Sequence, residues 1–172
     1  MLVSGLEAGA RESVTVNGQS PARPLVARVQ RVLPAVPDDV YAEWLDPEAL
    51  SAWMCPRPAR CLSVELEPRL GGRLRLDIED KGEEIFVVGK FTVLERPHRI
   101  SFTWHCSTWG DPDLQSVVTI ELEEIGESQT LLSLEHSLLP FDLVEQHERG
   151  WVAIAAQLGQ VLRRRLSTPR GG

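Results

Sequence analysis

The sequence has few of the residues that form disulfides or bind metal ions. It contains three cysteines and four histidines among 172 residues, and none of them follows CxxC or HxxxH spacing. An odd number of unpaired cysteines argues against a disulfide framework, so we expect Cys55, Cys61 and Cys106 to be free thiols. We likewise expect no metal ion and no other cofactor.

Long apolar runs and an excess of positive charge are also absent. No apolar stretch reaches the roughly 18 residues that span a bilayer, and the N-terminus does not have the pattern of a secretory signal. The formal net charge is −7, which disfavours nucleic acid as a partner. The GxSxG, Walker A and GxGxxG motifs are missing as well. We therefore expect a cytoplasmic protein with no membrane span, no nucleic-acid partner and no catalytic residue that a motif identifies.

The composition fits one ordinary folded domain. Hydrophobic residues make up 42% and charged residues 25% of the chain, and no internal repeat or linker divides it. Residues 1–23 are rich in Gly, Ser, Ala and Arg without a sustained period, so we predict a flexible lead-in there. The domain is predicted over 24–166, and a flexible tail over 167–172.

The first part of the domain predicts one strand and two short helices. Residues 24–33 alternate in polarity, which is typical of a strand. Pro37 and two following acidic residues open a helix that carries Trp44. Asp46 and Pro47 repeat this start signal as N-cap and first helical residue, and the second helix carries Trp53.

The middle of the chain changes to a period of two, which indicates strands separated by turns. In three of the expected strands, apolar residues alternate with polar ones. The apolar positions are Leu62, Val64 and Leu66 in the first, Leu74, Leu76 and Ile78 in the second, and Ile100, Phe102 and Trp104 in the third. Between the last two lies a long strand over 85–95, where Gly89 suggests a bulge or bend. Two further strands are predicted over 117–124 and 130–136.

The last element is predicted to be one long helix over 141–166. Apolar residues and His147 recur there at spacings of three and four, and Trp151 lies at the centre of this stripe. We expect Gly150 and Gly159 to allow a close approach to another surface, and 163–165, three arginines, to form a solvated helix end. The resulting fold class is α+β: a curved antiparallel sheet whose concave face the helix covers, with room for a cavity between them.

Several short motifs follow one another in a characteristic order and spacing: PDDVYAEWLDPEALSAW (37–53), Leu70-Gly71-Gly72, Val88-Gly89-Lys90, ERPHRISFTW (95–104), His136 and Gly150-Trp151. Through these motifs the sequence resembles the Hsp90-ATPase-activator-like branch of the START/Bet v 1-like superfamily over about 24–166. This resemblance implies the helix-grip fold, in which the sheet wraps around the long helix and encloses a cavity. The eukaryotic founder of the family stimulates a chaperone ATPase, so a chaperone or another protein is a candidate partner.

The resemblance also suggests where a ligand would bind. The short helices, the concave sheet and the long helix converge around the cavity in this fold, so aromatic and histidine side chains on them are the candidates. The candidate ligand-binding residues are Trp53, Phe91, Phe102, Trp104, His136, His147 and Trp151. The alternative for each is ordinary core packing. Cys106 follows His105, but neighbouring strand residues point to opposite faces, so we expect no thiol–imidazole pair.

Three functions follow from these expectations. The leading hypothesis is non-enzymatic binding of a small hydrophobic or aromatic molecule in the cavity. The second is an enzyme, such as a cyclase or hydrolase, that uses a polar group with a perturbed pKa in the same cavity. The third is a protein-interaction module, including a chaperone regulator, and a homodimer is a further partner to test.

Overall fold

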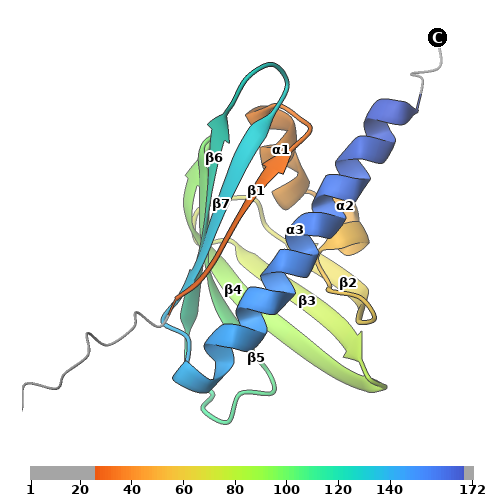
Figure 1. The fold of residues 1–172 in the computed structure, drawn as a ribbon. Helices are drawn as coiled ribbons and strands as arrows, with labels where there is room; N and C mark the ends of the chain where they lie inside the picture. Colours follow the sequence, from red (N-terminus) through yellow and green to blue (C-terminus); the bar gives the residue numbers. More distant parts are fainter. Residues whose placement is uncertain (1–25, 169–172) are drawn as a thin grey trace, which may run out of the picture.

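The computed structural model describes residues 26–168, so the predicted lead-in and most of the predicted tail lie outside the described residues. Figure 1 shows a curved sheet with one long helix lying diagonally across it. In chain order the elements are β1 (Ala27–Leu33), α1 (Pro37–Trp44), α2 (Pro47–Trp53), β2 (Arg60–Leu66), β3 (Arg73–Asp80), β4 (Glu83–Glu95), β5 (Arg99–Cys106), β6 (Ser116–Glu124), β7 (Thr130–Ser137) and α3 (Val144–Ser167). This is the predicted order, and the α+β helix-grip architecture is confirmed.

The strands form one antiparallel sheet in the order β1-β7-β6-β5-β4-β3-β2. From β2 to β7 each strand pairs with the next along the chain, and β1 closes the far edge against β7, with Val29 opposite Leu134. The two short helices follow β1, as predicted, and lie near the end of the sheet that the C-terminal half of α3 approaches (Figure 1).

The short helices are fixed by the signals that the sequence contains. Oδ1 of Asp46 accepts hydrogen bonds from the backbone N–H groups of Glu48 and Ala49, at 2.9 and 3.2 Å. This caps α2, which starts at Pro47. The indoles of Trp44 and Trp53 then meet edge to face, with ring centroids 4.8 Å apart. The two helices thus pack against each other through their tryptophans.

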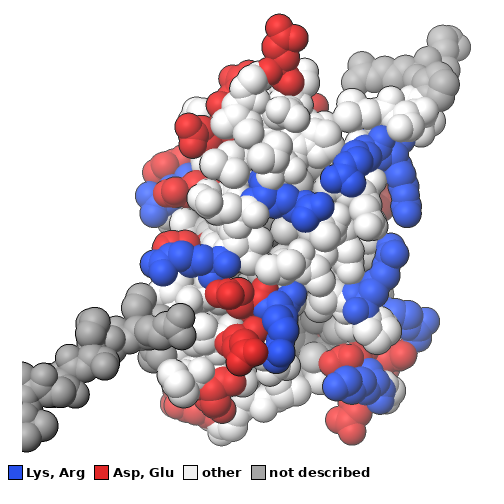
Figure 2. All heavy atoms as spheres, in the orientation of Figure 1, with Lys and Arg blue, Asp and Glu red and all other residues white. Residues whose placement is uncertain are grey.

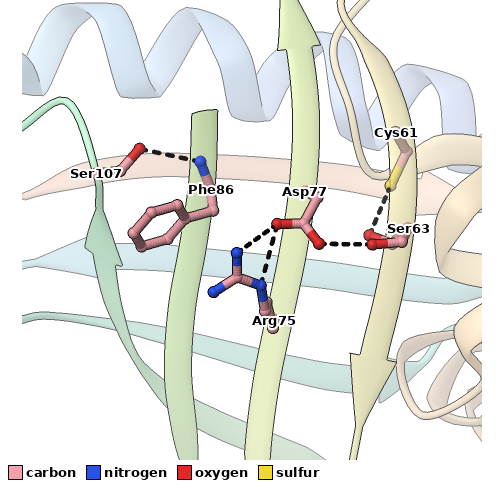
Figure 3. A network of polar contacts seen from close by, with 6 residues as sticks. All are labelled: Cys61, Ser63, Arg75, Asp77, Phe86 and Ser107. Carbon is pink, nitrogen blue, oxygen red and sulfur yellow. Dashed lines mark hydrogen bonds and ion pairs between the residues drawn. The ribbon is translucent and has the colours of Figure 1, made fainter. Parts of the chain in front are cut away.

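Strand β2 departs from the predicted alternation. Leu62 was expected on the apolar face with its neighbours, but its side chain is 46% exposed. The pairing of β2 with β3 shifts register between Cys61 and Ser63, and this irregularity turns Leu62 outward. Polar side chains lie around the bulge, where Oγ of Ser63 donates to Oδ2 of Asp77 at 2.6 Å (Figure 3).

The outer face of β3 and β4 carries the rest of this polar network. The guanidinium of Arg75 donates to Oδ1 of Asp77 through Nε and Nη2, and it also covers the ring of Phe86 at 4.5 Å (Figure 3). The hydrogen bonds from Arg75 and Ser63 hold the pKa of the Asp77 carboxyl below its ordinary value. The sheet face turned away from α3 is therefore polar at this edge. The alternate residues of β3, which are Leu74, Leu76 and Ile78, are buried on the opposite, inner face.

Two of the glycine motifs have steric explanations. Gly71 has φ +72°, and a Cβ on Gly72 would collide with the carbonyl oxygen of Glu67, so this turn requires both glycines. A Cβ on Gly89 would collide with the carbonyl oxygen of Thr103 on the neighbouring strand. The bulge was predicted at Gly89, but it lies further along β4, where the register against β5 shifts between Phe91 and Val93.

The long helix covers the concave face as predicted. Its buried residues include Trp151, Ile154, Leu158 and Leu162, and a 3₁₀ turn over Phe141–Leu143 precedes it. A Cβ on Gly159 would lie 3.3 Å from Nε of Arg31, so the expected close approach exists there. The same expectation is wrong for Gly150, where a Cβ would meet nothing within 4 Å.

The C-terminal arginines are not uniformly solvated. Arg165 forms an ion pair with Glu43 of α1, although its own side chain is 55% exposed. Glu43 is 4% exposed, and its Oε2 also accepts a hydrogen bond from Nε1 of Trp53 at 3.2 Å. The expectation of a wholly solvated helix end is therefore wrong for Arg165, which joins the end of α3 to both short helices.

Candidate ligand pocket

A cavity of about 610 Å³ lies between the N-terminal half of α3 and the inner face of β3, β4 and β5. Its size falls within the range of small-molecule sites, which is roughly 300–1,000 Å³. The sheet contributes apolar side chains at alternate positions, so they share one face. The apolar wall comprises Met54, Pro56, Leu76, Ile78, Ile85, Val87, Trp104, Trp109, Leu143, Trp151 and Ile154.

Charged groups at the wall are confined to one end of the cavity. Asp80, Lys81 and Glu83 belong to the β3–β4 hairpin and its turn, and exposed Gln146 lines the cavity from α3. Figure 2 shows positive and negative side chains gathered together where this hairpin ends. The mouth of the cavity is therefore polar, whereas its interior is mainly apolar.

Aromatic rings form the deep wall. Trp104 projects from β5 and Trp151 from α3, and their ring centroids are 5.4 Å apart. Trp109, in the loop after β5, lies 5.8 Å from the ring of His147. Three indoles and one imidazole thus face a single apolar space, an arrangement suited to stacking against a flat ring.

A chain of hydrogen bonds behind this wall fixes the orientation of Trp151. Its Nε1–H donates to Nδ1 of His136 at 3.0 Å. Because Nδ1 accepts, the neutral imidazole carries its proton on Nε2, which donates to Oγ of Ser116 at 2.7 Å. The hydroxyl of Ser116 in turn donates to the backbone carbonyl of Trp104 at 2.9 Å. Every donor in this chain has an acceptor, and the chain joins α3, β7, β6 and β5.

His136 remains neutral in this setting. Its side chain is fully buried, and burial, with a smaller contribution from nearby His147, lowers its pKa from 6.5 to about 3. A neutral, fully hydrogen-bonded imidazole has no free lone pair for a ligand. We assign His136 the role of holding Trp151 and the strands in place.

His147 differs from His136 because it reaches the cavity itself. Its Nδ1–H donates to the carbonyl oxygen of Leu143 at 2.9 Å, one turn earlier in the chain. Nε2 is then the second polar atom of the neutral ring, and its lone pair can accept a hydrogen bond. Burial lowers the pKa of His147 below its ordinary value, so the ring is neutral at neutral pH.

The structure brings together only some of the predicted site residues. Trp104, His147 and Trp151 lie at the cavity wall. Trp53, Phe91, Phe102 and His136 are almost completely buried and do not line this cavity, so ligand contact by these four residues stays a prediction.

The aromatic contacts give the reason for this placement. The ring of Phe102 packs between those of Phe91 and Trp44, at 5.9 and 6.4 Å, and Trp53 packs on Trp44. Close packing between the short helices and the sheet fills this end, and the cavity lies further along β5, toward Trp104.

Several wall residues were not predicted. Met54 and Trp109 lie in loops, where no period indicates which way a side chain points. Cys106 shares a face with Trp104, so strand alternation was a signal that could have found it. As predicted, Cys106 and His105 do not pair: Nδ1 of His105 contacts the carbonyl oxygen of Leu114, and Cys106 lies at the cavity.

The described part of the chain has neither a grouping of metal-binding side chains nor a membrane-spanning helix. Within 26–168, no three His, Cys, Asp or Glu side chains are grouped so that they could hold a metal ion. None of the helices described is both long and apolar enough to cross a membrane. All three cysteines are free thiols, as predicted.

Comparison with protein families gives one match over most of the domain. The model of the family described as "Activator of Hsp90 ATPase homolog 1-like protein" matches residues 34–163. Among curated proteins, no sequence matches the chain significantly. The match includes every strand from β2 to β7, both short helices and most of α3.

Solved structures with the same fold come from several sources. A Chromobacterium violaceum protein has a TM-score of 0.71 and 27% identity, and the match covers 80% of this chain and 96% of that one. An Hsp90 activator from Plasmodium falciparum has a TM-score of 0.65 and 22% identity, over 80% and 95% of the two chains. A protein described as putative, from the dynemicin biosynthetic locus, has a TM-score of 0.64 and 23% identity, over 80% and 47%.

Proposed function

The chain belongs to the activator of Hsp90 ATPase homolog 1-like family, and on this premise we propose that it binds a small hydrophobic or aromatic molecule without converting it. The binding site is the cavity between α3 and the inner face of β3, β4 and β5. The observation that carries this proposal is the cavity of about 610 Å³, with its apolar wall and its three indoles. Transfer of an apolar ligand from water into such a space supplies the binding free energy.

The composition of the wall favours a ligand that contains an aromatic ring. Trp104, Trp109 and Trp151 offer ring faces and edges from the sheet, a loop and α3. The chain of hydrogen bonds through His136 holds Trp151 and the backbone of Trp104 in fixed positions. A wall that is already ordered loses little conformational entropy when a ligand binds.

Naphthalene is a suitable first probe, because it is apolar, flat and smaller than the cavity. Binding should quench or shift the tryptophan emission, saturate at one molecule per chain, and raise the melting temperature as ligand concentration rises. Dodecane serves as a flexible apolar control and should bind less tightly than naphthalene. Absence of saturable binding by both probes would rule the proposal out.

Regulation of a chaperone is a second candidate, favoured by the family description and by the solved structure named as an Hsp90 activator. In this case the chain should increase the ATPase rate of a purified Hsp90-type chaperone in a concentration-dependent way. Bovine serum albumin at the same concentration is the control. An unchanged ATPase rate would remove this candidate and leave ligand binding untouched. The homodimer and the cytoplasmic location stay predictions.

A further inference from the structure

Two arginines come together outside the cavity, where α3 passes β1. Arg31 lies on the inner side of β1, and Arg163 lies on α3, one turn after Gly159. Nε of Arg31 and Nη2 of Arg163 are 3.3 and 3.7 Å from the position that a Cβ on Gly159 would take, so their separation is at most the sum of these distances. Gly159 thus leaves the space in which the two guanidinium groups meet.

Neither guanidinium has a counter-charge among the described residues. The ion pairs within 26–168 include neither Arg31 nor Arg163. Figure 2 shows positively charged side chains at the surface where α3 passes β1. Two like charges at this separation repel each other, and the repulsion is stronger where neighbouring atoms exclude water. An anion between the two groups would replace this repulsion by attraction.

The accessible part of Arg31 is the end of its side chain. Nε is buried and has no partner, so neither solvent nor a ligand reaches it. The terminal nitrogens form no hydrogen bond within 26–168 either, but they are not among the buried atoms without a partner, so they are open to solvent. Arg163 is exposed. An anion would therefore meet the terminal nitrogens of both side chains.

The free edge of β1 adds backbone donors at the same place. β1 is the last strand of the sheet, and the N–H of Arg28 points away from β7 and donates to Oε2 of Glu148 at 3.3 Å. Alternate N–H groups of an antiparallel strand point to the same side, so those of Gln30 and Val32, on either side of Arg31, also face this edge. The edge thus already binds one carboxylate of the chain.

We propose that Arg31 and Arg163, with the edge N–H groups of Gln30 and Val32, form a site for a phosphate group, which we call the arginine notch. Two guanidinium groups balance the two charges of a phosphate dianion, and their N–H forks match its oxygens. A monocarboxylate balances only one of them. None of the four residues lines the ligand cavity, so the arginine notch is independent of the function proposed for that cavity.

Calorimetric titration at pH 8 and constant ionic strength tests the arginine notch. Inorganic phosphate should bind about tenfold or more tightly than acetate, the contribution of one further charge-assisted hydrogen bond. Glycerol 2-phosphate offers the same group as a monoester. Tighter binding of the ester or of the free ion identifies which of the two is the source of the group, and either order supports the site. Equal affinities for phosphate and acetate would overturn it.

Three glutamine variants assign the binding to its residues. Arg163→Gln and Arg31→Gln should each weaken phosphate binding by about tenfold or more. Arg164→Gln removes the same charge from the next residue of α3 and is the matched control, with an affinity within about twofold of the wild type. If Arg31→Gln fails to fold, exposed Arg163 still decides the outcome. Equal losses in Arg163→Gln and Arg164→Gln would show general attraction of charge and would overturn the site.

Urea unfolding separates ligand binding from a structural role. Without phosphate, Arg163→Gln should be no less stable than the wild type, because it removes a repulsion. With phosphate, the wild type and Arg164→Gln should gain stability as the ligand concentration rises, and Arg163→Gln should gain less. A variant that is destabilised without phosphate and gains as much as the wild type with it would mean that Arg163 is structural, and the inference would be wrong.

Discussion

The indole N–H of Trp151 lies 3.0 Å from Nδ1 of His136, and this bond joins the long helix to the sheet. Both side chains are buried, with exposures of 2% and 0%. Trp151 contributes apolar packing on one side and a hydrogen bond on the other. The bond therefore connects the stability of the fold to the shape of the cavity.

The first prediction separates these two contributions of Trp151. Trp151→Ala should lower the free energy of unfolding by about 3–5 kcal/mol, as other large aromatic deletions do. Trp151→Phe retains much of the packing but leaves Nδ1 of His136 without a donor, which should cost about 1–3 kcal/mol. Trp109→Phe, at a half-buried indole, is the control, and urea unfolding measures all three. A Trp151→Phe variant no less stable than Trp109→Phe would contradict the role of the bond.

The second prediction concerns pH. The pKa of His136 is lowered from 6.5 to about 3 in the folded state, so at acidic pH the unfolded chain binds a proton that the folded chain does not. Stability is then full above pH 6.5 and falls by about 1.4 kcal/mol per unit below it. Between pH 7.5 and 5 the loss from His136 alone should be about 2 kcal/mol. His147, whose pKa is also lowered, adds to the loss.

His136→Asn tests the pH dependence because the asparagine amide can accept from Trp151 and cannot titrate. The variant should be less stable than the wild type at pH 7.5, and its stability should fall less steeply toward pH 5. Val152→Phe, at an exposed position without a titratable group, should have the slope of the wild type. Parallel slopes in the wild type and His136→Asn would contradict the assignment of a buried neutral imidazole.

The third prediction uses two glycines in different surroundings. Gly89→Ala should lower the free energy of unfolding by about 1–3 kcal/mol, the usual range for overpacking, because its Cβ would collide with the carbonyl of Thr103. Gly110→Ala adds the same methyl group where nothing lies within 4 Å, and should change stability by less than about 0.5 kcal/mol. Equal midpoints in thermal unfolding would contradict the pairing of β4 with β5.

The fourth prediction concerns the ion pair between Arg165 and Glu43. Arg165→Ala leaves the buried carboxylate of Glu43 without its cation and should cost about 1–3 kcal/mol. Adding Glu43→Gln should recover part of this loss, because the amide oxygen still accepts from Trp53 without a charge. Arg164→Ala, next in the sequence, is the control and should be near neutral. Urea midpoints that fall equally for the two arginine variants would contradict the assigned pair.

Local signals in the sequence predicted the elements and most of the fold. Asp46 and Pro47 mark the start of α2, and the alternation of Leu74, Leu76 and Ile78 identifies the inner face of β3, because capping and strand period act over a few residues. Leu62 was misplaced because a bulge changes the face without changing the pattern. The position of a bulge depends on how two strands pair, and the residues next to Leu62 do not indicate that pairing.

The site was less predictable than the fold. Alternation identified Phe102 and Trp104 as residues of one face, but it could not say where along β5 packing ends and the cavity begins. The contact of Arg165 with Glu43 joins residues that are far apart in the sequence, so no local pattern indicates it. Met54 and Trp109 line the cavity because of the course that their loops take, and no periodic pattern in the sequence predicts that course.

The most direct test of the central claim fills the cavity from its own wall. Gly150 faces the cavity and a Cβ there meets nothing within 4 Å, so Gly150→Phe should occupy the ligand space. Replacing a helical glycine should not lower stability, since glycine costs up to about 1 kcal/mol in a helix. Val152→Phe, on the same helix at a 52% exposed position, is the matched control. We predict that calorimetric titration with naphthalene gives one-site binding to the wild type and Val152→Phe, and none to Gly150→Phe. Equal binding by all three proteins would contradict the placement of the ligand in this cavity.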